Sequence, residues 1–514
     1  MLRLDPLRYF QQLSTRLIFL LLLVGVLSGG CIALAGEVGL FLPLALLVLV
    51  VLTGLALLAI PAIAKLVRRH GVAVLFVAGS LLWSAIFDFV IASNTTSWMK
   101  YHKGWSVRAQ GIGAGLIASP VVIVAGIQLL KKTKVQKPKT LLEFVPLFWI
   151  AVAVISALVG LLQENAMWYM MGDSYRFLLI PLVYWACIVT VTRSEQREFL
   201  WKFMVIYAVP ISLITILNQT YKFAIHSPFM VGKSVDAFAL SVSALLYTSS
   251  QRKRLRRFSL LVTVILMINA FVSWERRDWL IMALVWGLVL LLNRSRHRYR
   301  LLQMLLVASC LVLISLLVFN LMSPGLFTQI TARLQDRFDY TFNSDGLDPS
   351  SARRFLEMEF IAKEFKNAPP IGVLTGLGQG AEFHDPIAYW KKGSQPGLVH
   401  NVHNTYTGVF FRTGLLGVFL IGSFIFLSLR LAYKGIRNAR RQGSFQELIF
   451  SQASLIYLLV AFGITWNVDS SMGAVQVAVV VGLLVSAARD RHTRKRQSVH
   501  STRHDQSGSA LTRS

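Results

Sequence analysis

Charged residues are scarce in this sequence, and acidic residues are the scarcer kind. Only 15% of the 514 residues are charged, against about a quarter in an ordinary soluble domain. Cysteine is nearly absent as well, and the three cysteines have neither disulfide-framework nor zinc-site spacing. These shortages exclude an ordinary soluble domain and a disulfide-stabilised secreted scaffold.

The sequence is instead rich in long apolar runs. Hydrophobic residues make up 55% of the chain, and apolar runs of about twenty residues recur along almost its whole length. The sequence therefore predicts an all-α, polytopic integral membrane protein with about 14 transmembrane helices, in the range 12–14. The predicted spans are 17–36, 38–60, 72–92, 111–130, 141–162, 174–192, 199–218, 229–249, 258–274, 278–292, 301–323, 405–429, 448–466 and 471–488.

Basic residues gather in short clusters between the apolar runs. A net charge of +28 raises the possibility of a nucleic-acid partner, but this distribution argues against one. If the N-terminus is cytoplasmic, eight cytoplasmic segments hold 35 of the 52 lysines and arginines, as the positive-inside rule requires. We therefore predict cytoplasmic N- and C-termini, contact with membrane lipids, and no nucleic acid.

One predicted connection is far longer than the others. Residues 324–404 form a large loop on the outer face, and loops of this length are usually functional. The remaining parts are a cytoplasmic N-terminus (1–16), transmembrane helices 1–11 (17–323), helices 12–14 (405–488) and a basic, disordered cytoplasmic tail (489–514).

The long loop contains a predicted amphipathic helix. Asp348 is suited to cap it, Pro349 suits its first position, and Pro369–Pro370 ends it. The predicted apolar stripe consists of Phe355, Met358, Ile361 and Phe365. The stretch PPIGVLTGLGQG follows, and its glycines, among them Gly376 and Gly378, predict a tight, flexible turn without nucleotide-loop spacing.

Arginines away from the cytoplasmic face are candidates for chemistry, because charge at membrane depth costs at least a few kcal/mol. In SWERRDW, Arg276 and Arg277 lie between two spans and form either a short ion-paired turn or an anion site. In SSARRF, Arg353 and Arg354 form either a solvated basic face or an anion site at a helix N-terminus. The full outer-face set is Arg176, Arg276, Arg277, Arg353, Arg354 and Arg412.

The stretch HNVHNTYTG places His400 and His403 just before a predicted span. Histidine is the usual general base near neutral pH, although a hydrogen-bonded structural role remains the alternative. Carboxylates and cysteines at ligand spacing are missing beside these histidines, so we predict no metal and no cofactor.

In this order the motifs resemble the O-antigen ligase and polysaccharide polymerase superfamily of bacterial membrane glycosyltransferases. The matching features are Arg276 with Trp279 at a span junction, Arg354 at the start of the loop helix, and Pro369. They continue with Gly376 and Gly378, then His403–Asn404–Thr405–Tyr406, and RTGLLG at 412–417. The resemblance covers roughly residues 200 to 430.

The resemblance implies a glycosyltransferase-C-like protein of the bacterial inner membrane with a periplasmic active site. Such enzymes transfer a glycan from undecaprenyl diphosphate to a sugar hydroxyl, with inversion and without a metal. The acceptor is the lipid A core in ligases and another lipid-linked glycan in polymerases. The implied roles are His403 as catalytic base, Arg276 and Arg354 (with Arg277 and Arg353) at the donor diphosphate, and Asn404, Tyr406, His400, Gly376 and Gly378 in support.

Three alternatives remain beside an O-antigen ligase. A polymerase of the same superfamily shares every motif. A protein-glycan ligase would need the same donor site. A membrane transporter would show broken helices in corresponding positions of two halves, and that pairing is missing from the sequence.

Overall fold

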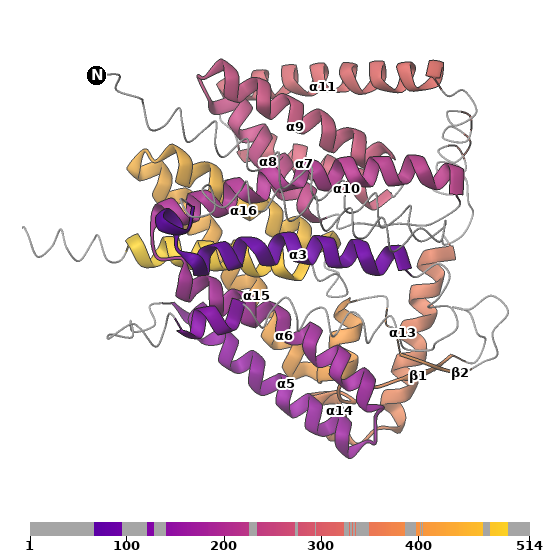
Figure 1. Ribbon diagram of the computed structural model, residues 1–514. Coiled ribbons are helices and arrows are strands. Elements are labelled where there is room, and N and C mark those ends of the chain that lie inside the picture. Colours follow the sequence, from indigo (N-terminus) through magenta and orange to yellow (C-terminus); the bar gives the residue numbers. More distant parts are fainter. Residues whose placement is uncertain are drawn as a thin grey trace, which may run out of the picture.

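The protein is a bundle of long helices that lie side by side, with short elements gathered at one end (Figure 1). The computed structural model describes residues 66–94, 121–127, 140–225, 234–272, 276–292, 295–322, 349–385, 397–400, 402, 405–465 and 473–491, and the single residues 328, 332 and 335. The long helices are α3 (Val72–Asn94), α5 (Val145–Leu162), α6 (Met167–Thr190), α7 (Ser194–Ile225), α8 (Ser234–Ser249), α9 (Lys253–Val272), α10 (Arg276–Leu292), α11 (Ser295–Met322), α15 (Thr405–Gln442), α16 (Phe445–Val460) and a C-terminal helix (Gly473–Arg491). A 3-10 turn, η2 (Leu141–Phe144), precedes α5, and a π-helical turn, η3 (Ala461–Thr465), follows α16.

Helix α8 lies at the centre of the bundle. It packs against α7, α9, α10, α11 and α16, and most of its described side chains from Ala237 onward are buried. The small side chains of α8, among them Ala239, Ser241 and Ser243, allow its neighbours to approach closely, as is common between helices inside a membrane. The C-terminal helix is buried in the same way over most of its length.

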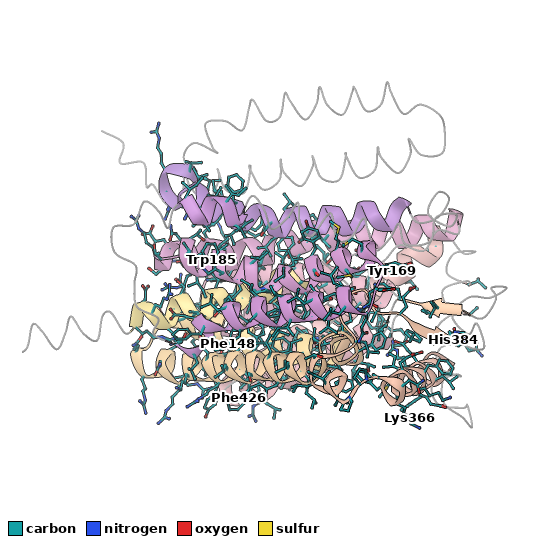
Figure 2. The ribbon with its side chains drawn as sticks, turned by 90° about the horizontal axis from the view of Figure 1, so that it is seen from below. Phe148, Tyr169, Trp185, Lys366, His384 and Phe426 are labelled. Atoms are coloured by element: carbon teal, nitrogen blue, oxygen red, sulfur yellow. The ribbon has the colours of Figure 1, made fainter. Side chains whose placement is uncertain are left out.

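Helices α5 and α11 instead present apolar side chains outward. Leu147 and Phe148 on α5, and Leu306 and Leu313 on α11, are each more than 60% exposed. Figure 2 shows Phe148 and Phe426 in the half of the bundle away from His384 and Lys366, and Phe426 is exposed as well. Such apolar outer surfaces suit contact with lipid rather than with water.

Six helices in the described part of the chain are long and apolar enough to cross a membrane. They are Leu141–Leu162, Tyr169–Thr190, Arg298–Ser315, Tyr406–Gln442, Phe445–Gly463 and Gly473–Arg491. The protein is therefore a helical, multi-pass membrane protein, as predicted. The predicted spans 17–36 and 38–60 lie outside the described residues, so the count of fourteen stays a prediction.

Several helices depart from their predicted bounds by five residues or more, and two of these departures bear on the site and the topology. Helix α6 begins at Met167, seven residues before the predicted span, so that Asp173 lies inside the helix. Helix α15 continues to Gln442, well past the predicted end at residue 429, through a basic last turn that suits the negative end of the helix dipole.

The loop elements are α13 (Pro349–Asn367), α14 (Pro370–Thr375) and the strands β1 (Phe383–Asp385) and β2 (Gly397–Val399). The two strands pair antiparallel, with Phe383 opposite Val399. This small sheet is an addition to the predicted all-α fold. The predicted loop helix agrees with α13, and Pro370 begins α14 at a position where its missing N–H costs nothing.

The predicted apolar stripe of α13 is wrong at two of its four positions. Phe355 and Met358 are exposed, while Phe360 and Ile361 are buried in a small core that includes Phe383 and Phe411. Ile361 and Phe365 do face this core, but the face begins at Leu356 and not at Phe355. The helix packs on the β hairpin and the start of α15, which selects this face.

The opposite end of the bundle is basic. Arg440 in the last turn of α15 donates to the carbonyl of Leu292 at the end of α10, at 3.2 Å. Arg300 near the start of α11 donates to the carbonyl of Thr248 at the end of α8, at 3.5 Å. We call this the basic end, and the end that carries α13, α14 and the β hairpin the loop end.

Candidate functional site

Helix α15 is broken at Gly414, and another segment of the chain crosses the helix at the break. At Gly414 the backbone angles are φ 62° and ψ −157°, outside the helical region. A break leaves the preceding carbonyls without their usual helical amide partners. The amides of Leu377 and Gly378 take their place, donating to the carbonyls of Phe411 at 2.8 Å and Arg412 at 3.2 Å.

Glycines allow this crossing, because the backbones touch. Gly376 (φ +77°) and Gly378 (φ +86°) both have left-handed conformations that favour glycine. A Cβ at Gly376 would lie 2.3 Å from the carbonyl carbon of Arg412, and a Cβ at Gly378 would lie 2.3 Å from the amide nitrogen of Gly160. The predicted turn is tight, as its glycines indicated, but the predicted flexibility is wrong, because the segment 375–381 is buried and held by contact on several sides.

Polar groups from α5 and its C-terminal turn hold the same segment. The Ser156 hydroxyl donates to the Arg412 carbonyl at 2.6 Å, and the Ser156 carbonyl accepts from the Gln379 amide at 3.0 Å. The Asn165 side-chain amide donates to the carbonyls of Leu377 and Gln379, each at 3.0 Å. The crossing thus has its backbone groups bonded to α5, to the turn after α5 and to α15.

A buried ionic cluster lies beside this crossing. Asp173 Oδ2 is 2.6 Å from Arg412 Nε and accepts from the Gly380 amide at 3.0 Å, while Asp173 Oδ1 is 3.3 Å from His400 Nε2. Arg412 Nη2 also donates to the His400 carbonyl at 2.9 Å. The Tyr169 ring stacks on the imidazole of His400 at 4.1 Å between centroids. We call Asp173, His400 and Arg412 the loop-end cluster.

Burial strengthens this cluster. The side chains of Asp173, His400 and Arg412 are 3%, 4% and 13% exposed. Charges in such surroundings are weakly screened, and an unpaired one would be costly. Figure 2 shows Tyr169 at the same end of the bundle as His384 and Lys366, which places the cluster's neighbour at the loop end.

The predicted catalytic motif continues directly from this cluster. His403 and Asn404 lie outside the described residues, but both flanks are described. On one flank His400 is in the cluster and Val402 is buried. On the other, Tyr406 lies in the first turn of α15, and its hydroxyl donates to the Phe462 carbonyl in η3. The motif is therefore attached on both sides to fixed parts of the loop end.

The predicted phosphate-binding arginines begin two helices. Arg276 and Arg277 are the first residues of α10, and Arg353 and Arg354 are in the first two turns of α13. The side chain of Arg354 is exposed, whereas those of the other three are outside the description. Trp279 donates its indole N–H to the Ala270 carbonyl at 3.1 Å, which fixes the α9–α10 junction. Since Leu292 ends α10 at the basic end, the junction faces the loop end. Whether the two arginine pairs meet one ligand stays a prediction.

Sequence reasoning gave Asp173 no role and left Arg412 unassigned. Arg412 was among the outer-face arginines, where membrane depth alone marks it as a candidate. Asp173 fell in a predicted loop, because an acid breaks an apolar window. The sequence did contain one indication of this ion pair: an acid and an arginine without an assigned role lie at the same predicted face of the membrane. Among the described residues, no group of three or more His, Cys, Asp or Glu side chains could hold a metal ion.

The fold and the loop end define a multi-pass membrane protein with a polar cluster at one surface of its bundle. Residues 261–422 match a family model described as O-antigen ligase. This match confirms the predicted resemblance to the O-antigen ligase and polysaccharide polymerase superfamily, and its range includes Arg276, Arg354 and His403. None of the curated proteins compared with the chain matches it.

Proposed function

We propose that the protein is an O-antigen ligase-like transferase. It moves a glycan from undecaprenyl diphosphate to a sugar hydroxyl of the lipid A core at the periplasmic face of the bacterial inner membrane. The observation that supports this most directly is the ordered loop end: the chain before His403 is held in a buried cluster at the start of a membrane-crossing helix. The family match over residues 261–422 supports the reaction class.

In the proposed reaction, His403 removes the proton from the acceptor hydroxyl as its oxygen attacks the anomeric carbon. The bond between that carbon and the diphosphate oxygen breaks on the opposite face, so the configuration inverts without a metal. Undecaprenyl diphosphate leaves with the bonding electron pair, and the proton on His403 later passes to water. A base speeds attack by a poor nucleophile, typically by about 10²–10⁴-fold.

Arg276 and Arg354 act on the leaving group in this proposal, with Arg277 and Arg353 beside them. Negative charge grows on the diphosphate as the glycosidic bond breaks, so cations placed there stabilise the transition state more than the ground state. The N-terminus of α13 adds backbone N–H groups and the positive end of its dipole. Asn404 orients His403 or a sugar hydroxyl.

The test is glycan transfer by purified variants in detergent or proteoliposomes. We expect His403→Ala to lower turnover by about 10²-fold or more, and Arg276→Ala and Arg354→Ala by about 10²-fold each. His384→Ala, at the exposed position of β1, and Arg298→Ala at the basic end are matched controls that retain turnover. Near-normal transfer by any one of the three variants removes that residue's proposed role.

The acceptor separates a ligase from a polymerase, and a deletion strain reports it. Loss of the proposed ligase leaves full-length glycan on the undecaprenyl carrier. Loss of a polymerase would leave a lipid A core capped with a single repeat, and that outcome would reassign the acceptor while keeping the donor chemistry.

A further inference from the structure

The carboxylate of Asp173 connects three segments that are far apart in the sequence. It belongs to α6, and its partners are the Gly380 amide of the glycine crossing, His400 after β2, and Arg412 in α15. A carboxylate that is 3% exposed and has polar partners within 3.3 Å of both oxygens has little freedom to move. The segments that carry Gly380, His400 and Arg412 are therefore held in place relative to α6.

Arg412 contacts the backbone of His400 and so connects the two ends of the segment 400–412. Its guanidinium binds Asp173 through Nε and the His400 carbonyl through Nη2, at 2.6 Å and 2.9 Å. Between these two points the chain folds back on itself: a Cβ at Gly408 would lie 3.4 Å from both Val402 Cβ and Arg412 Nη1. Both ends of the 400–412 segment are therefore anchored to one carboxylate.

We infer that Asp173 is a positioning residue that sets the place of His403 by anchoring His400 and Arg412 on either side of it. This inference rests on the proposed function, in which His403 is the base. His403 follows His400 by three residues, so anchoring His400 limits where the base can reach. Asp173 touches neither donor nor acceptor in this account; it acts through its two partners.

The planar guanidinium of Arg412 fixes the orientation of this contact as well as its position. One nitrogen contacts the carboxylate while another contacts the His400 carbonyl, a two-point contact that lysine lacks. Misplacing a catalytic group by about 1 Å costs about 10²-fold in rate. Loss of the anchor should therefore lower kcat while the donor still binds.

The first experiment is a double-mutant cycle between Asp173→Asn and His403→Ala. Asparagine keeps the size and an acceptor oxygen but loses the charge. We expect Asp173→Asn to lower kcat by about 10²-fold with donor KM changed less than about threefold, and to add less than about threefold in the His403→Ala background. A full multiplicative loss in that background would overturn the inference, because it would mean that Asp173 acts independently of His403.

Glu143→Gln is the matched control. Glu143 is a similarly buried carboxylate, 4% exposed, and pairs with Arg489 at the basic end. Its loss should lower thermal stability and change kcat by the same small factor with or without His403. If Glu143→Gln reproduced the kcat loss of Asp173→Asn, burial of any carboxylate would explain the effect and the inference would fail.

A second measurement is independent of transfer activity. Diethyl pyrocarbonate modifies accessible imidazoles, and mass spectrometry reports the rate at each histidine. We expect the modification rate of His403 to change at least about threefold in Asp173→Asn, while exposed His384 keeps its rate. An unchanged rate at His403 overturns the positioning role. A changed rate in a protein whose wild type transfers no glycan would leave that role standing and overturn the proposed function.

Arg412→Lys provides the test if Asp173→Asn does not fold. It keeps the positive charge beside Asp173 and loses the fork that also holds the His400 carbonyl. The same kcat loss and the same change at His403 are expected. A folded Arg412→Lys protein with wild-type kcat and wild-type modification of His403 would overturn the inference.

Discussion

The two ends of the bundle use arginine in different ways. At the basic end, Arg440 and Arg300 donate to carbonyls at helix ends, where the helix dipole also favours a cation. At the loop end, Arg412 is buried against Asp173 and holds the chain that leads to the proposed base. The basic-end contacts secure helices that apolar packing already places, whereas the loop-end contacts fix segments that have little core of their own.

Glycine shows the same contrast. Gly71 near the basic end and Gly378 at the loop end have nearly the same φ, +85° and +86°. A Cβ at Gly71 would meet nothing within 4 Å, whereas one at Gly378 would lie 2.3 Å from the backbone of α5. The two glycines therefore have the same backbone conformation, but a side chain fits at Gly71 and does not fit at Gly378.

The largest effect is expected from alanine at Gly378, with Gly71→Ala as the matched comparison. Gly71→Ala adds only the left-handed strain, about 1–2 kcal/mol. Gly378→Ala adds the same strain and an overlap with backbone atoms that cannot rotate away, for a total of about 4 kcal/mol or more. Thermal unfolding in detergent and the yield of monodisperse protein measure both. Equal losses for the two variants would show that the crossing is looser than its contacts imply.

Glutamine in place of arginine tests whether the two ends of the bundle differ in function. Arg412→Gln leaves Asp173 buried without its cation, which costs about 3 kcal/mol, and frees the His400 carbonyl. Arg440→Gln changes an exposed side chain and costs about 0.5 kcal/mol or less. Turnover should fall at least about tenfold in the first variant and stay unchanged in the second. Similar thermal and kinetic changes in both would mean that the two ends do not differ in function.

Much of the helical framework could be predicted from the sequence, because each span is a local apolar pattern. The bounds predicted for α3, α10 and the loop helix α13 differ from the structure by only a few residues. The loop end could not be predicted in this way. Gly378 touches Gly160, and Asp173 binds Arg412; neither partner is near in the sequence, and no periodicity links them. In the sequence, the charge of Asp173 counts against a membrane helix at this position. Its partner Arg412 becomes evident only in the folded structure.

Tyr406 tests how much the start of α15 depends on its own contacts. Tyr406→Phe removes the hydroxyl that donates to the Phe462 carbonyl in η3 and leaves the ring in place. A lost hydrogen bond of this kind costs about 1 kcal/mol. We expect a small fall in melting temperature and turnover within a few-fold of wild type. A loss as large as that of His403→Ala would instead place Tyr406 among the residues that contact substrate.

The smallest effect is a pH dependence at the basic end. Burial lowers the pKa of His70 below its usual 6.5, the nearby Arg69 lowers it further, and Glu195 partly offsets both. The His70 ring stacks on Phe199 at 4.5 Å between centroids. Since the unfolded chain binds a proton more readily at this site, the contribution of His70 to stability is present above pH 6.5 and is lost as the pH falls below that value.

His70→Phe keeps a stacked ring but cannot bind a proton. The difference in melting temperature between wild type and His70→Phe should therefore be constant above pH 7 and shift in favour of the variant between about pH 6.5 and pH 5. The slope with pH is the measurement, because a change in packing moves both ends of the curve equally. Transfer activity above pH 7 should be the same in both proteins. A pH-dependent difference in kcat would contradict the division between a structural basic end and a functional loop end, since His70 would then influence chemistry at the far side of the bundle.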